Sequence, residues 1–275
     1  MTAYASFTAP DAAAWIAMPT ATDDKYTRGV LGVATGSDRY PGAAVLGVEA
    51  ALRTGVGMVR YVGPPRATDL VLNRRPEAVP ARGRVQAWLV GSGMDAAERD
   101  EALLTSLVAE DVPVVLDGGA LDLAARAAGP VVITPHYREL ARLLGADAAD
   151  IAADPGAWAE RASGQLGVTV LLKGATTYIH GPTAAGGTAA YTVTGAPAWL
   201  ATAGAGDALG GVLGALVATH SASIHEDPGA LAALAATAAV LHGEAATRAG
   251  SGGPFTILDL CSQLPAVVRD LLSRR

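Results

Sequence analysis

The alternation of short aliphatic runs with longer Ala- and Leu-rich stretches is the feature that most constrains this chain. Residues 29–34, GVLGVA, are typical of a buried strand, and GAAVLGVEAALRTG at residues 42–55 predicts a helix that ends at Gly55. Uninterrupted apolar strands are typical of parallel sheets, because helices bury both of their faces. The sequence therefore predicts an α/β fold with a mainly parallel central sheet flanked by helices on both faces. Further strands are expected at MVRYVG, AWLVGS, VPVVLDGG, VVITPH and VTVLLKG, with a helix at RELARLLG.

The rest of the chain fits the same sheet. The Gly- and Thr-rich residues 174–195 predict hairpins, with PTAAGGTAA at a hairpin tip. Pro265 could kink the final helix. No repeat, charge run or Pro/Gly/Ser linker divides the chain, so residues 1–275 are interpreted as one domain. Most of the last third is expected to be helical, over residues 205–220, 228–247 and 256–272.

Charge and cysteine content argue against several classes of partner. The net charge of −6 comes without a basic patch for nucleic acid or an anionic membrane. Cys261 is the single cysteine, which excludes an internal disulfide, suits a reducing cytoplasm and predicts a core residue. The N-terminus has no basic residue before Lys25, unlike a secretory signal, and no window holds the roughly 18 uninterrupted apolar residues of a membrane helix. A soluble cytoplasmic protein is predicted.

The stretch WLATAGAGDALGG contains an acid, Asp207, where a loop is expected to become a helix. The first N–H groups of a helix lack intrahelical partners, so the TAGAG loop before Asp207 could wrap a phosphate. Asp207 could equally be an N-cap or first-turn acid that only stabilises the helix. The glycine spacing does not fit GxGxxG, and the GK[ST] of a Walker loop is missing. The local pattern leaves both roles open.

Two further strand ends carry groups that suit a nucleotide. Lys173 directly follows a buried strand and precedes Gly174 and two threonines, so it could bind phosphate, although a solvated lysine in an ordinary turn fits the same pattern. Pro135 ends another strand and brings His136 and Glu139 to the same sheet edge. His136 could contact a ligand or be satisfied within its loop. Glu139 fits a first-turn acid that offsets the helix dipole.

Other chemistries find less support. The other histidines show no HxxxH spacing and no CxxC occurs, so no metal site built by the protein is predicted, while Mg²⁺ is expected to accompany nucleotide phosphates. The absence of a GxSxG elbow argues against a serine hydrolase of that type. Two more loops, GSDRYPGAAVLG and VGSGMDAAER, have glycines that would let a ligand approach the backbone.

Taken together and in this order, the motifs resemble those of the ADP-dependent NAD(P)H-hydrate dehydratases, a carbohydrate-kinase-related family with a ribokinase-like fold. YPGAA, TPHxxE and KGATT in combination are more specific to this family than GAGD, which occurs across ribokinase-like kinases. The resemblance covers about residues 25–218. The matching segments are KYTRGVLGVATGSDRYPGAAVLGVEAALRTGVGMV, VGSGMD, VVLDGGAL, ITPHYRELARLLG, TVLLKGATTYI and WLATAGAGDALGGVLGALVA.

The resemblance implies repair of hydrated nicotinamide cofactors. The S epimer of NADH hydrate or NADPH hydrate would be phosphorylated on its hydroxyl, and elimination of phosphate would restore NADH or NADPH. The donor would be ADP in the bacterial form, giving AMP, or ATP in the eukaryotic form. The resemblance makes Asp207 the catalytic base. The hydrate-binding positions would be Ala43, Gly93, His136 and Asp207; the nucleotide-binding positions Lys173, Gly174, Ala175, Thr176, Thr177 and Gly206; and the anion hole Thr202, Ala203, Gly204, Ala205 and Gly206.

Two departures from the family pattern concern the dinucleotide pocket rather than the phosphate site. GSGMD stands where the family usually has GPGLG, and ATGS where it often has GGS. The resemblance also implies a homotetramer, and an epimerase of the same pathway that is expected to be a separate protein because the chain has no room for a fused epimerase domain.

Two alternatives remain. A ribokinase-like small-molecule kinase, of the hydroxyethylthiazole or pyridoxal type, would use the same GAGD anion hole and the same base. A catalytically silent nucleotide-binding protein on this fold is the second, and the intact Asp207 argues against it.

Overall fold

One mixed sheet organises the protein. The computed structural model describes residues 2–184 and 186–273, and in this part of the chain nine strands lie in the order β1-β9-β8-β7-β6-β5-β4-β2-β3. Neighbouring strands are parallel, except that β8 runs antiparallel to β7 and β9. The carboxyl ends of all strands but β8 therefore point to one edge. The strands are β1 (Ala5–Ser6), β2 (Val30–Ala34), β3 (Met58–Tyr61), β4 (Ala87–Val90), β5 (Val114–Leu116), β6 (Val131–Ile133), β7 (Thr169–Leu172), β8 (Thr177–Pro182) and β9 (Thr188–Val193).

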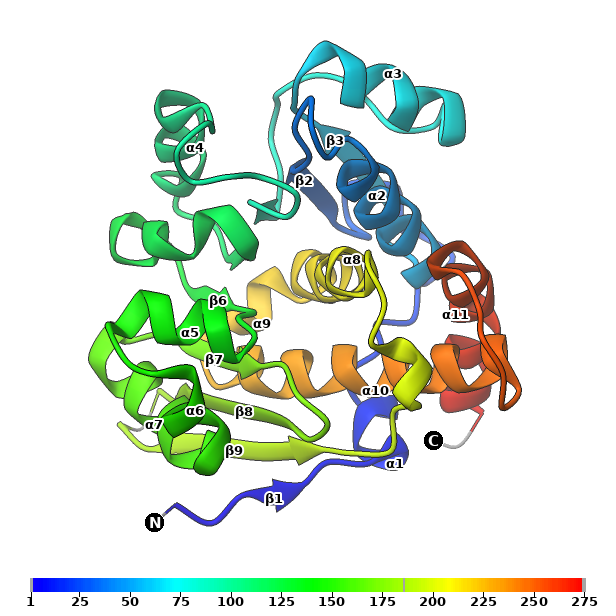
Figure 1. The fold of residues 1–275 in the computed structure, drawn as a ribbon. Coiled ribbons are helices and arrows are strands. Elements are labelled where there is room, and N and C mark those ends of the chain that lie inside the picture. The colour runs from blue at the N-terminus through cyan, green and yellow to red at the C-terminus, as the bar shows by residue number, and fades with distance from the viewer. Residues whose placement is uncertain (1, 185, 274–275) are drawn as a thin grey trace.

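Helices cover both faces of the sheet (Figure 1). The core on one face is shared by α1 (Ala9–Ala13), α2 (Gly42–Thr54), α3 (Pro65–Arg74), α8 (Ala205–Thr219), α9 (Ser221–Glu226), α10 (Ala230–Gly250) and α11 (Ile257–Leu272). The core on the other face is shared by α4 (Glu101–Val108), the 3-10 segment η1 (Gly118–Arg126), α5 (Tyr137–Leu144), α6 (Ala148–Ala153) and α7 (Pro155–Leu166). A second 3-10 segment, η2 (Ala198–Leu200), precedes α8.

Successive strand residues enter the two cores in turn, which explains why the strands are apolar throughout. In β2, Leu31 and Val33 pack in the core that α2 and α8 cover, whereas Val30 and Ala34 pack in the core that α4 and η1 cover. All four side chains are fully buried. The predicted α/β architecture, a mainly parallel sheet with helices on both faces, is confirmed.

The predicted elements are confirmed with shifts of a few residues at their ends. The hairpin is formed by β8 and β9, with PTAAGGTAA at its tip; Ala185 of this tip lies outside the described residues. Cys261 is a core residue as expected, and its burial raises the pKa of its thiol to about 12. α11 continues as a helix through Pro265. The sequence patterns missed the shorter or more polar elements β1, α1, α3, α4, α6, α7 and α9.

α10 is long and apolar enough to cross a membrane by length and hydropathy alone, with a mean hydropathy of 1.3. However, 89% of its most apolar window is buried inside the protein. It packs against α1, α8 and α11 and against the strands at the β9 end of the sheet. α10 is therefore a core helix of this fold.

Candidate active site

Polar loops follow the parallel strands at one edge of the sheet. Asp117 follows β5, Thr134–His136 follow β6, and Lys173 follows β7. α8 begins at the same edge, because a Cβ placed on Gly206 would lie 3.4 Å from Lys173 Nζ. The strand ends and the first turn of α8 thus enclose one site, in the position where parallel α/β sheets bind their ligands.

The first turn of α8 has no side-chain cap. Gly204 is the N-cap residue, with a left-handed φ of 89° that favours glycine. A Cβ at this position would also lie only 2.5 Å from Leu46 Cδ1. Asp207 stands in the first turn, so its interpretation as an N-cap is wrong and its interpretation as a first-turn acid is confirmed. The Ala205 N–H donates to the Thr202 carbonyl at 3.3 Å, whereas the N–H groups of Gly206 and Asp207 make no such bond within the described residues and are available to an anion.

Asp207 is a half-buried carboxylate near other charges. Burial raises its pKa to about 6, with a further contribution from the Asp117 carboxylate, while the Lys173 ammonium acts in the opposite direction. A carboxylate with a pKa near 6 is mostly ionised at neutral pH and is a stronger proton acceptor than an ordinary aspartate. Asp207 thus has the electrostatic character of a general base.

Lys173 forms ion pairs with two carboxylates. Its Nζ donates to Asp117 Oδ1 at 2.9 Å and lies 3.7 Å from Glu139 Oε2, and its side chain is 21% exposed. Burial opposes its charge, but Asp117 and Glu139 raise the pKa of Lys173 above its ordinary value. The alternative of a solvated lysine is therefore wrong.

His136 is satisfied within its own loop. Its Nδ1 accepts from the Glu139 backbone N–H at 3.2 Å, and the Glu139 carboxylate accepts from the His136 backbone N–H at 2.8 Å, forming a capping box at the start of α5. Both predictions for this pair hold: Glu139 is a first-turn acid, and His136 has a local partner. The same histidine also lines the cavity described next.

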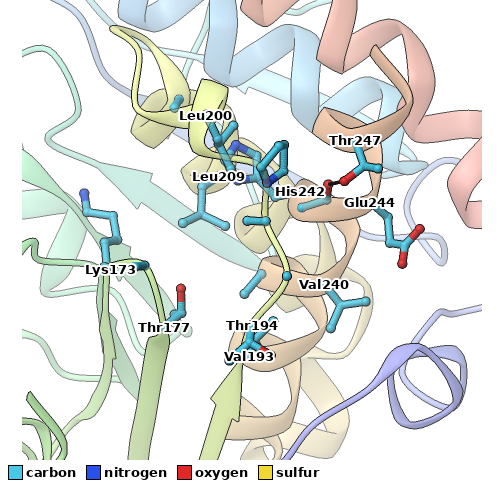
Figure 2. A pocket seen from close by; sticks show the side chains of 18 of the residues that line it. Lys173, Thr177, Val193, Thr194, Leu200, Leu209, Val240, His242, Glu244 and Thr247 are labelled. Carbon is cyan, nitrogen blue, oxygen red and sulfur yellow. Dashed lines mark hydrogen bonds between the residues drawn. The ribbon is translucent and has the colours of Figure 1, made fainter. Parts of the chain in front are cut away.

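A cavity of about 1080 Å³ opens beside the first turn of α8. Figure 2 shows Lys173 and Thr177 on one side and His242, Glu244 and Thr247 of α10 on the other. Its volume suits a nucleotide-sized ligand. Of the residues predicted for nucleotide, anion or hydrate, the cavity wall includes His136, Lys173, Gly174, Ala175, Thr177, Thr202, Ala205 and Gly206, and it does not include Ala43, Gly93, Thr176, Ala203, Gly204 or Asp207.

Ala43 and Gly93, predicted for the hydrate, meet each other outside this cavity. A Cβ on Gly93 would lie 2.3 Å from Ala43 Cβ, and Gly93 has a left-handed φ of 67°. α2, which carries Ala43, also packs closely on α8: a Cβ on Gly47 would lie 3.6 Å from the Asp207 carbonyl oxygen. The first turn of α8 thus borders the cavity at Ala205 and Gly206 and packs against α2 at the Asp207 carbonyl.

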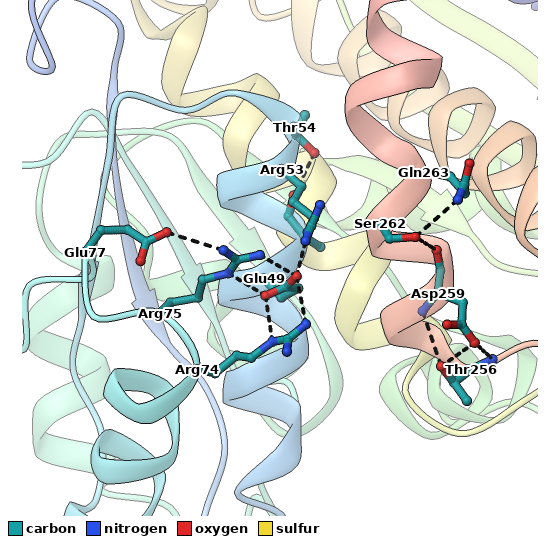
Figure 3. Close-up of polar contacts among 11 residues, drawn as sticks. Glu49, Arg53, Thr54, Arg74, Arg75, Glu77, Thr256, Asp259, Ser262 and Gln263 are labelled. Atoms are coloured by element: carbon teal, nitrogen blue, oxygen red, sulfur yellow. Dashed lines mark hydrogen bonds and ion pairs between the residues drawn. The ribbon is translucent and has the colours of Figure 1, made fainter.

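A buried carboxylate ties α2 to the end of α3 (Figure 3). The Glu49 side chain, which is 0% exposed, accepts hydrogen bonds from Arg53 of α2, from Arg74 and from Arg75. Burial alone would raise the pKa of Glu49, but the three arginines lower it to about 2. This ion cluster supports the helix whose first turn contains Ala43.

Replacing Glu49 with glutamine is expected to lower the free energy of unfolding by about 3–5 kcal/mol, because three arginines lose their common anion. The folded-state pKa lies below the ordinary value of 4.5, so this stabilisation is present above about pH 4.5 and is lost as the pH falls through about 2. Urea unfolding measures the effect. Glu77→Gln is the matched control, because Glu77 is half exposed and pairs with Arg75 alone at 3.5 Å. Equal losses in the two variants would contradict the assigned role.

The sequence patterns did not single out Asp117 or the cavity residues of α10. Asp117 follows a buried strand as Lys173 does, so the same criterion could have found it. His242, Glu244 and Thr247 belong to a helix whose apolar pattern indicates only a core element, and only the tertiary fold makes them line the same cavity as Lys173.

No group of three or more His, Cys, Asp or Glu side chains that could hold a metal ion occurs among residues 2–184 and 186–273. Mg²⁺ bound to a nucleotide takes most of its ligands from phosphate and water and needs only one or two carboxylates. Mg²⁺ that arrives with nucleotide phosphates would therefore not require such a group.

Comparison with known proteins identifies a family. Residues 31–254 match the family model described as NAD(P)H-hydrate dehydratase. The bifunctional NAD(P)H-hydrate repair enzyme Nnr of Mycobacterium tuberculosis is 43% identical over 225 residues, which are 78% of this chain and 46% of that protein. The chain thus spans about half the length of the first curated relatives it matches.

Relatives of more similar length, and a solved structure, agree with this match. The ADP-dependent (S)-NAD(P)H-hydrate dehydratase of Neisseria meningitidis is 34% identical over 215 residues, covering 70% of this chain and 71% of that protein. The ADP/ATP-dependent NAD(P)H-hydrate dehydratase of Bacillus subtilis, co-crystallised with ATP/Mg²⁺, superposes with a TM-score of 0.85 at 26% identity, covering 98% of this chain and 100% of that one. The expected ribokinase-like fold is confirmed.

Proposed function

The chain belongs to the NAD(P)H-hydrate dehydratase family, and from that premise we propose that it catalyses the ADP-dependent dehydration of the S epimer of NADH hydrate or NADPH hydrate. One observation carries the proposal. Asp207, a half-buried carboxylate with a pKa of about 6, lies at an uncapped helix start, next to Gly206 in the wall of a nucleotide-sized cavity and on a helix that packs against α2, which carries Ala43. A phosphoryl donor on one side and a hydroxyl acceptor on the other require a base at this position.

The cavity would hold the adenine nucleotide. Lys173, Gly174, Ala175, Thr177 and Gly206 line it and offer an ammonium group, backbone N–H groups and a hydroxyl. The N–H groups of Gly206 and Asp207 at the start of α8 would bind the terminal phosphate, with Thr202 and Ala205 in the same wall. Gly204 would shape the anion hole through its left-handed backbone conformation. Ala203 and Thr176 would contribute to nucleotide binding as members of the two loops that carry the cavity-lining residues.

The hydrate would bind on the α2 side of Asp207, against Ala43 and Gly93, while His136, which lines the cavity, would contact it from the nucleotide side. Asp207 would accept the proton of the hydrate hydroxyl. The hydroxyl oxygen would bond to the terminal phosphorus of ADP while the bond from that phosphorus to the AMP oxygen breaks. The C–O bond of the phosphorylated hydrate then breaks with help from the electron pair of the ring nitrogen. Phosphate departs, and the neighbouring carbon releases a proton to complete the nicotinamide double bond.

Mg²⁺ would neutralise charge on the nucleotide phosphates when bound. The chain's own contributions are to orient the donor along the cavity wall, to keep the acceptor hydroxyl beside Asp207, and to hold the proton at the Asp207 carboxylate. Positioning of this kind supplies much of the catalysis in phosphoryl transfer.

The value of kcat/KM is expected to fall as the pH drops through about 6, because only ionised Asp207 accepts the hydroxyl proton and its pKa is about 6. Below that pH the loss should approach tenfold for each unit. A pH–rate profile between about pH 5 and 8 measures it. A profile that stays flat down to pH 5 would exclude Asp207 as the base.

The direct test mixes purified protein with NADH hydrate and ADP or ATP and follows recovery of reduced-nicotinamide absorbance at about 340 nm. Recovery with ADP, and release of AMP, are expected. The kinase alternative predicts instead that no absorbance returns with either nucleotide and that a small alcohol is phosphorylated. Family membership favours the dehydratase.

Several finer expectations stay predictions. These are the preference for ADP over ATP, the homotetramer, the cytoplasmic location, the single domain and a separate epimerase that would interconvert the two hydrate epimers. Size-exclusion chromatography with light scattering measures the oligomer.

A further inference from the structure

The ends of three neighbouring strands are joined by side chains beneath the site. Asp117 Oδ1, just after β5, accepts from Thr134 Oγ1, just after β6, at 2.7 Å and from Lys173 Nζ, just after β7, at 2.9 Å. Asp117 and Thr134 are almost fully buried, at 4% and 1% exposure. A buried carboxylate with such partners is held in one orientation.

This bridge fixes the Lys173 ammonium group at the start of α8. The Lys173 backbone is also held, because its N–H donates to the Pro135 carbonyl at 2.8 Å. With both ends of the side chain restrained, Nζ lies near Gly206, within the first turn of α8. Within the described part of the chain, Lys173 makes ion pairs with Asp117 and Glu139 but not with Asp207.

The charges that face Asp207 come from several elements. Asp117 at the end of β5 repels its ionised form, and Lys173 at the end of β7 attracts it. Glu139 of α5 acts on Lys173, whose Nζ lies 3.7 Å from Glu139 Oε2. His242 of α10 is buried, and its burial lowers its pKa to about 4, so it is neutral near pH 7. Asp117 is therefore the one anion among these groups that acts directly on Asp207.

We propose that Asp117 is a positioning residue for phosphoryl transfer: it holds the Lys173 ammonium at the phosphate end of the cavity and away from a direct ion pair with Asp207. The proposal rests on the proposed function, since it assumes that Asp207 is the base. Without Asp117, the Lys173 ammonium could pair with the Asp207 carboxylate, which would lower the pKa of Asp207 and make it a weaker proton acceptor. The nucleotide would also lose a fixed cation.

The test is Asp117→Asn, which keeps the shape of the side chain and removes its charge. The acidic limb of the kcat/KM profile should move toward lower pH by about one unit, because a repelling anion is lost and an attracting cation is freed. The KM for ADP should rise about tenfold. Asp122→Asn is the matched control, because Asp122 is exposed on η1 and pairs with Arg99; its profile should be that of the wild type.

Carbon-13 NMR of labelled aspartate carboxyls, with Asp207 assigned from its Asn variant, follows the same titration without any turnover. Asp207 should titrate near pH 6 in the wild type and about one unit lower in Asp117→Asn. An unshifted Asp207 in the folded variant overturns the proposal. If the wild type fails to dehydrate NADH hydrate, the proposed function fails, and the NMR titration still decides the role of Asp117.

Thr134→Val covers the case in which Asp117→Asn does not fold. It removes the hydroxyl that orients Asp117 but keeps both charges. The KM for ADP should rise several-fold while the acidic limb stays in place, and Thr134→Ser should restore the wild-type KM. A KM unchanged in Thr134→Val would overturn the proposed bridge.

Discussion

Asp207→Asn is expected to lower kcat by on the order of 10²–10⁴-fold or more while ADP still binds. Asparagine keeps the shape of the side chain at the start of α8 but cannot take the hydroxyl proton. The first-turn N–H groups and the cavity wall, which would bind the nucleotide, are unchanged by the substitution. Absorbance recovery measures turnover, and isothermal titration calorimetry measures ADP binding.

The matched control is Asp259→Asn. Asp259 is also in the first turn of a helix, α11, where it forms a capping box with Thr256 and has no contact with the cavity. The Asp259→Asn variant should lose some stability but keep the wild-type turnover. Wild-type turnover in Asp207→Asn would exclude the proposed mechanism, and loss of ADP binding together with turnover would make Asp207 a structural residue.

Lys173→Ala is expected to raise the KM for ADP by about 10–100-fold, because a charge-assisted hydrogen bond to phosphate contributes roughly 1.5–3 kcal/mol. The variant also leaves Asp117 buried without its cation, which should lower the free energy of unfolding by about 3–5 kcal/mol. Initial rates at varied ADP concentration measure the first effect, and urea unfolding measures the second.

Lys173→Ala combined with Asp117→Asn separates the two effects. Removing both charges should recover much of the stability but none of the ADP affinity, because the buried anion is gone and the phosphate still lacks its cation. Lys25→Ala is the control, since Lys25 lies over the exposed Tyr26 ring and is not among the residues that line the cavity. An unaltered KM in Lys173→Ala would mean that the pair with Asp117 is only structural.

Local sequence patterns predicted the main elements well because each depends on short-range chemistry. The β2 segment is apolar on both sides, and Gly55 ends α2 in a left-handed conformation, with φ of 109°. α7 was missed, although Asp154 caps it and Pro155 stands at its first position, because its moderate amphipathicity is hard to distinguish from a loop. Start signals in such helices carry more information than their periodicity.

The candidate site was predictable where a residue's neighbours in the chain define it. Gly204 and Gly206 around an acid indicated a phosphate-binding helix start, and Gly204 indeed takes a left-handed conformation there. The solvated alternative for Lys173 could not be rejected from the chain alone, because its partner Asp117 is 56 positions away. Strand order brings the two together, since β5, β6 and β7 are neighbours in the sheet.

The sequence by itself determined the α/β class, the order along the chain of the strands after β1, and the residue types that stand at the strand ends. Only the tertiary structure decided that the Asp117 carboxylate pairs with the Lys173 ammonium, that α10 completes the cavity, and that Asp207 has a pKa of about 6. Backbone preferences act between near neighbours in the chain, so a local pattern reveals them. Burial and Coulomb interactions depend on distance in space, which the packing of remote segments sets.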